Sequence, residues 1–271
     1  MIKLVACDMD GTLLDSQKRL PADFPQVMTA LKERGVCFAV ASGRQYAALR
    51  RDFEAYLEDM MFICENGALV MQRDERLLID PVDPRELYRI VTAAKGLRGV
   101  YPVVCRAEMA LIEKTASPEF IRNTCMYYPS VQVVDDLTEY CNLGDVCKVA
   151  FYDEYDAQTH ELPELQSKLE SELSIILSGE HWVDVMKPGV TKGAAMRGIQ
   201  QKLGITPEEC MAFGDYLNDC ELLQSVGESY AMENAHPRLK EMARHIAPSN
   251  DEDGVMRVIR RELGLTEGGA Q

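Results

Sequence analysis

The chain has 271 residues, of which 46% are hydrophobic and 27% are charged, proportions that suit a globular protein of one large or two modest domains. Its net charge of −15 argues against a nucleic-acid partner, because no basic stripe is present to meet phosphates. No apolar run is long enough to span a bilayer, and the start, Met1 to Lys3, lacks the regions of a secretory signal.

The nine cysteines are scattered along the chain, with no CxxC pair and no His/Cys cluster at zinc-ligand spacing. Several lie inside apolar runs, where a thiol packs as a small hydrophobic side chain. This usage is typical of a reduced compartment. We therefore expect a cytoplasmic protein, a monomer or a homodimer, with neither nucleic acid nor a membrane as a partner.

The first 84 residues predict strands that alternate with helices. Short aliphatic runs that end in polar residues are typical of buried strands in a parallel sheet. Gly35 stands where a glycine would close the first helix. The fold class expected is α/β, with a doubly wound, mostly parallel sheet. In chain order the expected elements are a strand at Ile2–Cys7, a helix at Phe24–Arg34, a strand at Val36–Ala41, a helix at Tyr46–Leu57, a strand at Met61–Cys64, and a hairpin of Ala68–Met71 with Leu77–Asp80.

Pro81 and Pro84 break this alternation, and a domain boundary is expected there. Residues 85–187 are predicted to form an inserted α+β domain, because pairs of adjacent strand-like runs suggest an antiparallel sheet. The expected elements are a helix at Arg85–Lys95, strands at Tyr101–Cys105, Ala110–Ile112, Val131–Val134, Val146–Tyr152, Ile175–Leu177 and Trp182–Met186, and helices near Pro118–Met126 and Leu162–Leu173.

Pro188 and Gly189 mark the return to the first pattern, so residues 1–84 and 188–271 are expected to form one core domain. Thr191 can cap the next helix, and Gly204 can close it. The final residues, Thr266–Gln271, are expected to be a frayed tail. The expected elements are helices at Lys192–Leu203, Cys220–Val226, Pro237–Arg244 and Gly254–Leu263, and strands at Cys210–Phe213, Ser229–Met232 and His245–Ala247.

Two aspartates, Asp8 and Asp10, follow the first predicted strand. At positions i and i+2 their side chains begin on the same side, and Gly11 then lets the backbone turn without a Cβ penalty. Two carboxylates so close repel each other unless a divalent metal neutralises one, which leaves the other to act as an acid or a base. The alternative is that both side chains form turns and cap a helix.

Other polar residues follow the ends of later strands or open a helix between them. A pair of carboxylates, a hydroxyl, an ammonium group and a second acidic cluster suit a phosphate ester with Mg²⁺, which prefers oxygen ligands. Lysine supplies a positive point charge, and serine with nearby N–H groups can bind further phosphate oxygens. The candidates are Ser42, Lys192, Asp215, Asn218 and Asp219.

Each of these residues also has a purely structural interpretation. Ser42 could cap a helix, and the acidic cluster could be ordinary turn and cap residues. Lys192 as a lone residue would usually be a solvated surface lysine, although a lysine is unfavourable at a helix start. The four histidines share no metal-ligand spacing, so we expect them to be structural or exposed.

The order of the motifs resembles the haloacid-dehalogenase-like superfamily over essentially the whole chain. The four motifs are D-M-D-G-T-L-L, S-G-R, T-K-G and G-D-Y-L-N-D. The sequences E-N-G-A, A-M-E-N-A and N-D-E-D-G-V are similar to the Cof-type branch, subclass IIB. The resemblance implies a Rossmann-like core, with residues 85–187 as a C2B-type cap domain that closes over the site, excludes water and contacts the leaving group.

The resemblance also implies a role for each site residue. Asp8 would attack phosphorus and form an aspartyl-phosphate, and Asp10 would protonate the leaving alcohol and then deprotonate water. The Asp8 carboxylate, the Asp10 carbonyl and Asp215 would bind Mg²⁺. The phosphoryl oxygens would be held by Ser42, Gly43, Lys192 and Asn218, and Asp219 would orient Lys192 or a metal-bound water.

The function expected is that of a Mg²⁺-dependent phosphatase acting on small phosphorylated metabolites, with sugar phosphates as the common substrates of the family. A sugar phosphomutase would use the same nucleophile and would differ in water access. A non-catalytic protein that binds phosphorylated metabolites is a third hypothesis, against which the intact Asp8 and Asp10 argue. The cap sequence does not indicate the substrate.

Overall fold

A computed structural model describes residues 1–169 and 173–264, and these residues form two compact units. Of the described residues, one unit contains 1–43, 55–78 and 191–264, and the other contains 44–54, 79–169 and 173–190. The predicted core and cap boundaries stay a prediction. The predicted frayed tail, Thr266–Gln271, and residues 170–172 of the helix predicted at Leu162–Leu173 lie outside the described residues.

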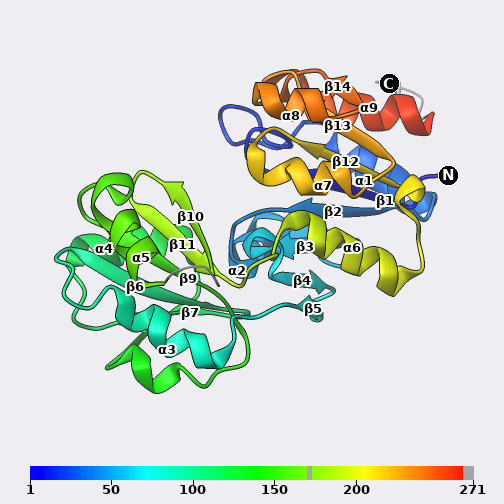
Figure 1. Cartoon of the computed structure of the whole chain (residues 1–271). Coiled ribbons are helices and arrows are strands. Elements are labelled where there is room, and N and C mark those ends of the chain that lie inside the picture. Colours follow the sequence, from blue (N-terminus) through cyan, green and yellow to red (C-terminus); the bar gives the residue numbers. More distant parts are fainter. Residues whose placement is uncertain (170–172, 265–271) are drawn as a thin grey trace. The chain divides into compact units, whose positions relative to one another are not determined.

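The first unit is built on an eight-stranded sheet with the order β14-β13-β12-β1-β2-β3-β4-β5 (Figure 1). Five neighbouring pairs, from β14 to β3, are parallel, and β4 pairs antiparallel with β3. The strands are β1 (Leu4–Asp8), β2 (Cys37–Ala41), β3 (Met60–Cys64), β4 (Leu69–Gln72), β5 (Glu75–Ile79), β12 (Cys210–Gly214), β13 (Glu228–Met232) and β14 (His245–Ala247).

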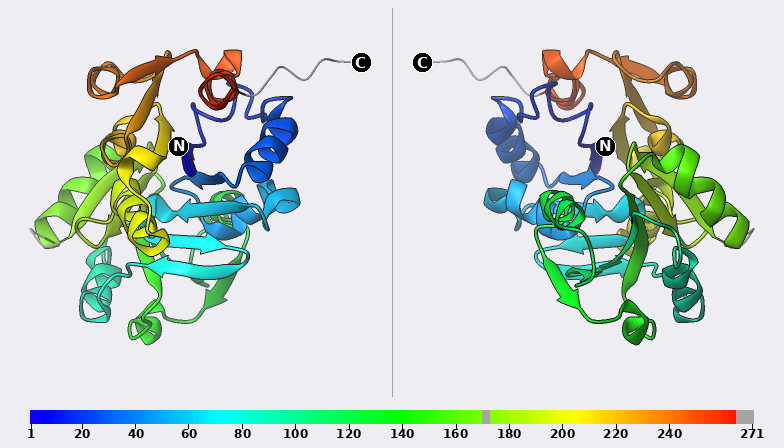
Figure 2. Two further views of the ribbon diagram at one scale, coloured as in Figure 1. Left: turned by 90° about the vertical axis from the view of Figure 1, so that its right-hand side faces the viewer. Right: turned by 90° about the vertical axis from the view of Figure 1, so that its left-hand side faces the viewer.

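Helices lie on both faces of this sheet (Figure 2), as the prediction of a doubly wound sheet requires. In α1 the buried residues Phe24, Val27, Met28 and Leu31 recur with the spacing of one helical face, and Gly35 at φ 68° follows its end. The helices of the unit are α1 (Phe24–Glu33), α6 (Lys192–Leu203), α7 (Cys220–Gln224), α8 (Pro237–Met242) and α9 (Gly254–Leu263). The described helices include none with the length and apolar character needed to cross a membrane.

The second unit contains a six-stranded sheet with the order β10-β11-β9-β6-β7-β8. Alternate residues of β9 pack into two apolar clusters, with Val149 and Phe151 in one and Ala150 and Tyr152 in the other. The elements are α2 (Tyr46–Asp52), α3 (Pro84–Ala93), β6 (Val100–Arg106), β7 (Ala110–Glu113), α4 (Pro118–Tyr127), β8 (Val131–Val134), β9 (Val146–Asp153), α5 (Leu162–Lys168), β10 (Ser174–Gly179) and β11 (Trp182–Met186).

Three expectations about the elements are wrong, and one of them is the helix expected at Leu162–Leu173, which ends at Lys168. The sheet of the second unit is not purely antiparallel, because β7 and β8 pair in parallel. The helix α4 connects these two strands, and a helical crossover returns the chain in the same direction. The helix expected at residues 46–57 ends at Asp52, and a separate 3₁₀ turn follows at Glu54–Tyr56.

Candidate active site

The predicted site residues of the first unit follow strands that are neighbours in its sheet. Asp8 is the last residue of β1 and pairs with Ala41 of β2, so Ser42 comes one residue later. On the other side of β1 lies β12, and Asp215 directly follows its last residue. Because parallel strands end at the same edge of the sheet, these side chains begin at one edge, as the sequence predicts.

Lys192 is a fully buried lysine in contact with two of the predicted acidic residues. Its Nζ lies 2.5 Å from Asp8 Oδ1 and 2.7 Å from Asp219 Oδ1, and the residue is 1% exposed. It is the first residue of α6, and the Thr191 hydroxyl caps that helix by accepting from the Ala194 N–H. The cap is the one predicted from the sequence. The surface interpretation of Lys192 is wrong, because the side chain is buried between carboxylates.

Asp219 contacts Lys192 and also accepts hydrogen bonds from the backbone. Its Oδ2 accepts from the backbone N–H groups of Asp215 and Tyr216 at 3.1 and 3.2 Å, while its Oδ1 contacts Lys192. The residue is completely buried. A carboxylate with these three donors has little freedom to move, so the Lys192 ammonium is fixed as well.

Asp8, Asp215 and Asp219 form a cluster that could hold a metal ion. One oxygen from each lies within 4.8 Å of the others. Three carboxylates around one ammonium leave two negative charges without a compensating cation, which is the charge that one divalent ion supplies. The donors are all oxygens, the type that hard cations such as Mg²⁺ prefer. The donor set therefore fits a divalent metal.

The pKa values of the cluster are consistent with this excess of negative charge. Burial raises the pKa of Asp8 to about 8; Lys192 opposes the shift, and the negative charges of Asp219 and Asp215 add to it. Burial and the charge of Asp219 also raise the pKa of Asp215. Burial would lower the pKa of Lys192, but Asp219 and Asp8 outweigh it, and the pKa is raised. We conclude that Lys192 is charged and that a second cation would favour ionised Asp8 and Asp215.

The remaining predicted residues, Asp10, Ser42, Gly43 and Asn218, have neighbours of their own, Lys18 and Asn66. The Asp10 carboxylate accepts from Lys18 Nζ at 2.8 Å. Ser42 is 3% exposed, and its carbonyl accepts from the Asn66 N–H. The Asn218 amide contacts Asn66 Oδ1 at 3.4 Å. A Cβ placed on Gly43 would lie 3.1 Å from the Asn66 side chain, so Asn66 stands beside the second and fourth motifs.

Three contacts at the site were not predicted from the sequence. The Thr12 hydroxyl donates to Asp215 Oδ1 at 3.1 Å, Lys18 pairs with Asp10, and Asn66 contacts Asn218. Thr12 and Asn66 belong to the motifs D-M-D-G-T-L-L and E-N-G-A, but their partners lie far away in the chain. Lys18 lies outside the motifs, and its left-handed backbone at φ 63° is not evident from the sequence.

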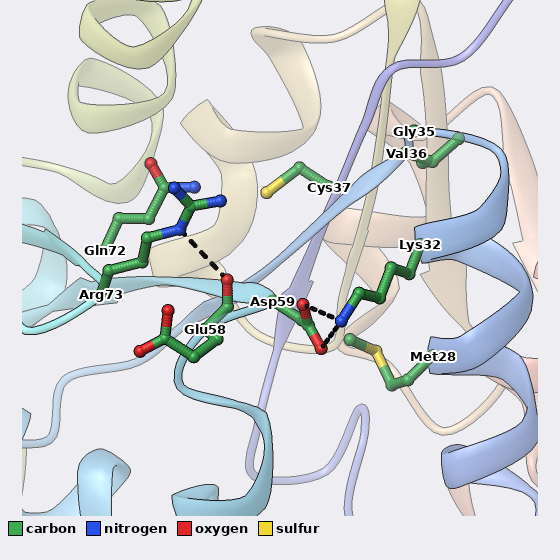
Figure 3. Close-up of a pocket in the computed structure, with 9 residues that line it drawn as sticks. All are labelled: Met28, Lys32, Gly35, Val36, Cys37, Glu58, Asp59, Gln72 and Arg73. Carbon is green, nitrogen blue, oxygen red and sulfur yellow. Dashed lines mark hydrogen bonds and ion pairs between the residues drawn. The ribbon is translucent and has the colours of Figure 1, made fainter.

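A pocket in the first unit lies elsewhere on the sheet (Figure 3). It includes Cys37, the first residue of β2, and Gln72, the last residue of the antiparallel strand β4, so it lies at the opposite edge of the sheet from the cluster. Among its lining residues Lys32 pairs with Asp59, and Arg73 donates to the Glu58 backbone carbonyl. The pocket contains none of the predicted site residues.

Comparison with known proteins gives the family. The sequence profile of the haloacid dehalogenase-like hydrolases matches residues 5–259. The chain is 31% identical, over 97% of its length and 96% of the relative's, to the 5-amino-6-(5-phospho-D-ribitylamino)uracil phosphatase YbjI of Escherichia coli K12. It is 29% identical to the HMP-PP phosphatase of Klebsiella pneumoniae, with 93% and 91% of the two chains covered.

A solved structure has the same fold. SMU.1108c from Streptococcus mutans UA159 matches with a TM-score of 0.83 and 26% identity, over 97% of this chain and 100% of the other. The predicted α/β fold class is confirmed, and the prediction of a phosphoric monoester hydrolase is confirmed at the level of the family. The chain belongs to the haloacid dehalogenase-like hydrolases.

Proposed function

We propose that the protein is a Mg²⁺-dependent phosphatase that hydrolyses small phosphate monoesters through an aspartyl-phosphate on Asp8. The observation that carries this proposal is the buried ammonium of Lys192, which lies 2.5 Å from Asp8 Oδ1. A carboxylate repels an approaching phosphate ester. A fixed cation at that carboxylate reduces the repulsion and can stabilise charge that develops on the phosphoryl oxygens.

In the first step a carboxylate oxygen of Asp8 forms a bond to phosphorus while the bond from phosphorus to the ester oxygen breaks. The leaving alkoxide takes a proton from Asp10. In the second step water attacks the phosphorus, Asp10 takes a proton from that water, and the bond between phosphorus and Asp8 breaks to release inorganic phosphate. Asp10 ends each cycle protonated, as it began.

The metal would be held by the Asp8 and Asp215 carboxylates and by the Asp10 backbone carbonyl. When bound, it would neutralise these carboxylates and polarise the phosphoryl group. Asp219 is assigned the positioning of Lys192, because three donors already occupy its two oxygens. The phosphoryl oxygens would be bound by Ser42, Gly43, Lys192 and Asn218. The fixed, buried ammonium of Lys192 supports its part in this set.

The substrate class is proposed from the relatives. One is named for a phosphate ester of a ribityl chain on a pyrimidine, and another is named for HMP-PP. We propose sugar and sugar-alcohol phosphates as the preferred substrates, with phosphorylated cofactor precursors next. The partner would be a small phosphate ester alone.

The test is a phosphate-release assay against a panel of sugar phosphates and cofactor-precursor phosphates, with Mg²⁺ and with a chelator. We expect turnover with Mg²⁺ and loss of activity with the chelator. Asp8→Asn should lower kcat by at least about a thousandfold, because an amide cannot replace the carboxylate nucleophile.

The matched control is Asp59→Asn, another carboxylate-to-amide change in the same unit, at the pocket of Figure 3. Asp59 pairs only with an exposed lysine among the described contacts, so kcat should stay within about twofold of the wild-type value. Absence of phosphate release from every ester, or full activity in Asp8→Asn, would contradict the proposal.

A further inference from the structure

The turn that follows the two aspartates has two backbone carbonyls that its own amides do not satisfy. Within the turn, the Leu13 and Leu14 N–H groups donate to the carbonyls of Asp8 and Met9 at 3.2 and 2.9 Å. The carbonyls of Gly11 and Leu14 instead accept from the side-chain amides of two distant asparagines. Asn234 Nδ2 donates to Gly11 O at 2.8 Å, and Asn250 Nδ2 donates to Leu14 O at 2.9 Å.

The two asparagines are also bonded to each other. The Asn250 backbone N–H donates to Asn234 Oδ1 at 3.2 Å. A chain of hydrogen bonds therefore runs from Gly11 through Asn234 and Asn250 to Leu14. Both asparagines belong to motifs that the catalytic roles leave unexplained, A-M-E-N-A and N-D-E-D-G-V.

The same loop also holds the acidic residue on the neighbouring strand. The His236 N–H, two residues after Asn234, donates to the Asp215 carbonyl at 2.8 Å. The Asp215 carboxylate in turn accepts from Thr12, the residue next to Gly11. A closed ring of contacts thus links the turn of Asp10 to Asp215 through the loop that contains Asn234.

The turn needs this support because its pivot is a glycine. Gly11 has φ +86°, and a Cβ at this position would lie 2.4 Å from Asp215 Oδ2, so no other residue fits without strain. A glycine also permits many other conformations. A hydrogen bond to its carbonyl holds the peptide between Gly11 and Thr12 and so restricts the rotation about Gly11 that would change the direction of Asp10.

We propose that Asn234 is a positioning residue that locks the Gly11 turn and thereby keeps Asp10 aimed at the reacting phosphoryl group. The proposal rests on the proposed phosphatase function. Asn234 is exposed, so water competes for its hydrogen bond and the expected effect is moderate. Asn250, which is 8% exposed, holds the Asn234 side chain through its backbone N–H.

The experiment compares three variants with the wild-type enzyme. Asn234→Ala removes both contacts of the side chain. Asn234→Asp keeps an acceptor for the Asn250 N–H but cannot donate to the Gly11 carbonyl. Gln200→Ala is the matched control, because Gln200 Nε2 also donates to a backbone carbonyl, that of Ser225, at 2.7 Å in the same unit. Gln200 has no contact with the proposed site residues in the hydrogen bonds described.

We expect Asn234→Ala to lower kcat about tenfold with KM changed less than about threefold, because the substrate still binds while Asp10 is misaligned. Asn234→Asp should lose at least as much. Gln200→Ala should lower the thermal midpoint at least as much as Asn234→Ala does, with kcat within about twofold of wild type. Hydrogen exchange at the Leu13 and Leu14 amides should be faster in Asn234→Ala than in wild type.

The proposal would be overturned by a wild-type kcat in Asn234→Ala or by a wild-type kcat in Asn234→Asp. It would also be overturned if Gln200→Ala lowered kcat as much as Asn234→Ala does, because the loss would then follow from reduced stability. Failure of the proposed function is a separate result, because it would appear as a wild-type enzyme that releases no phosphate. In that case the exchange measurement still tests the turn. Unchanged hydrogen exchange at these amides in Asn234→Ala would overturn the role of Asn234 in holding the Gly11 turn.

Discussion

Lys192 shows how one buried charge can organise a site. Burial alone lowers the pKa of a lysine that is 1% exposed, yet the two carboxylates in contact with Lys192 raise its pKa and favour the charged ammonium. Removing one partner of such a buried pair usually costs about 3–5 kcal/mol, because the other charge is left without compensation. Burying these charged groups therefore contributes little to the stability of the fold, but it provides a positive charge in a fixed position.

Glu161 is a buried acid of the other unit and has a different environment. The residue is completely buried, and neither carboxylate oxygen has a hydrogen-bond partner among the described residues. Burial, followed by the negative charges of Asp153 and Asp184, raises the pKa of Glu161 from the ordinary 4.5 to about 9. The protonated form is therefore the one that suits the folded state.

The stability of the second unit should then fall as pH rises. An acid whose pKa is higher in the folded than in the unfolded state stabilises the fold fully below its unfolded pKa. That contribution is lost as pH rises from about 4.5 through about 9. We predict that Glu161→Gln, which carries no charge to lose, has a flatter profile and a thermal midpoint several degrees above wild type at the alkaline end.

Thermal unfolding followed across this pH range would measure the difference. Glu164→Gln, three residues along the chain in α5, is the control, since the Glu164 side chain is 52% exposed and its replacement should leave the wild-type profile unchanged. Parallel profiles for wild type and Glu161→Gln would show that Glu161 is ionised in the folded protein.

At the scale of elements, the start of α6 packs closely against α7 and against the turn that contains Gly67. A Cβ on Gly193 would lie 2.3 Å from the Glu221 carbonyl oxygen of α7. A Cβ on Gly67, which has φ +108°, would lie 2.2 Å from the Thr191 carbonyl oxygen. Both obstacles are backbone atoms, which cannot move aside as a flexible side chain can. The two glycines therefore allow the helix that begins with Lys192 to approach the sheet edge.

We predict that Gly193→Ala destabilises the protein by about 1–3 kcal/mol and lowers kcat, because the helix must shift and take Lys192 with it. Gly198→Ala on the same helix is the control. Its Cβ would meet only the end of the Leu78 side chain at 2.9 Å, and alanine favours a helix by about 1 kcal/mol over glycine. Chemical denaturation with parallel kinetics would compare them, and equal losses in both variants would argue against the close approach.

Element boundaries were predictable where local chemistry decides them. Thr191 and Gly204 delimit α6 at the predicted residues, and the strand at Val131–Val134 has the predicted bounds. The parallel pairing of β7 with β8 was not predictable, since it depends on which edge the chain reaches after α4. Residues at strand ends could be named as a site because parallel strands bring them to one edge. Contacts such as Asn234 with Gly11 depend on side-chain placement, which no sequence pattern specifies.

At the scale of the whole molecule, the chain carries a net charge of −15 and is proposed to act on anions. In the proposed site, the buried Lys192 ammonium and a divalent cation held by the carboxylate cluster would offset this negative charge locally. The family was predictable because four motifs, each at the end of a strand or the start of a helix, occur along the chain in the order typical of the family. The substrate was not predictable, since the motifs describe how a phosphoryl group is transferred and do not describe the leaving group of the ester.

The most direct test of the account is to trap the phosphoryl group on the enzyme. The protein would be mixed with a labelled phosphate ester and Mg²⁺, quenched in acid, digested and mapped by mass spectrometry. The account predicts a phosphoryl group on the peptide that contains Asp8, removable by hydroxylamine as an acyl phosphate is, and no label in Asp8→Asn. Rapid turnover in the wild-type enzyme with the label on another residue, or with Asp8→Asn still active, would contradict it.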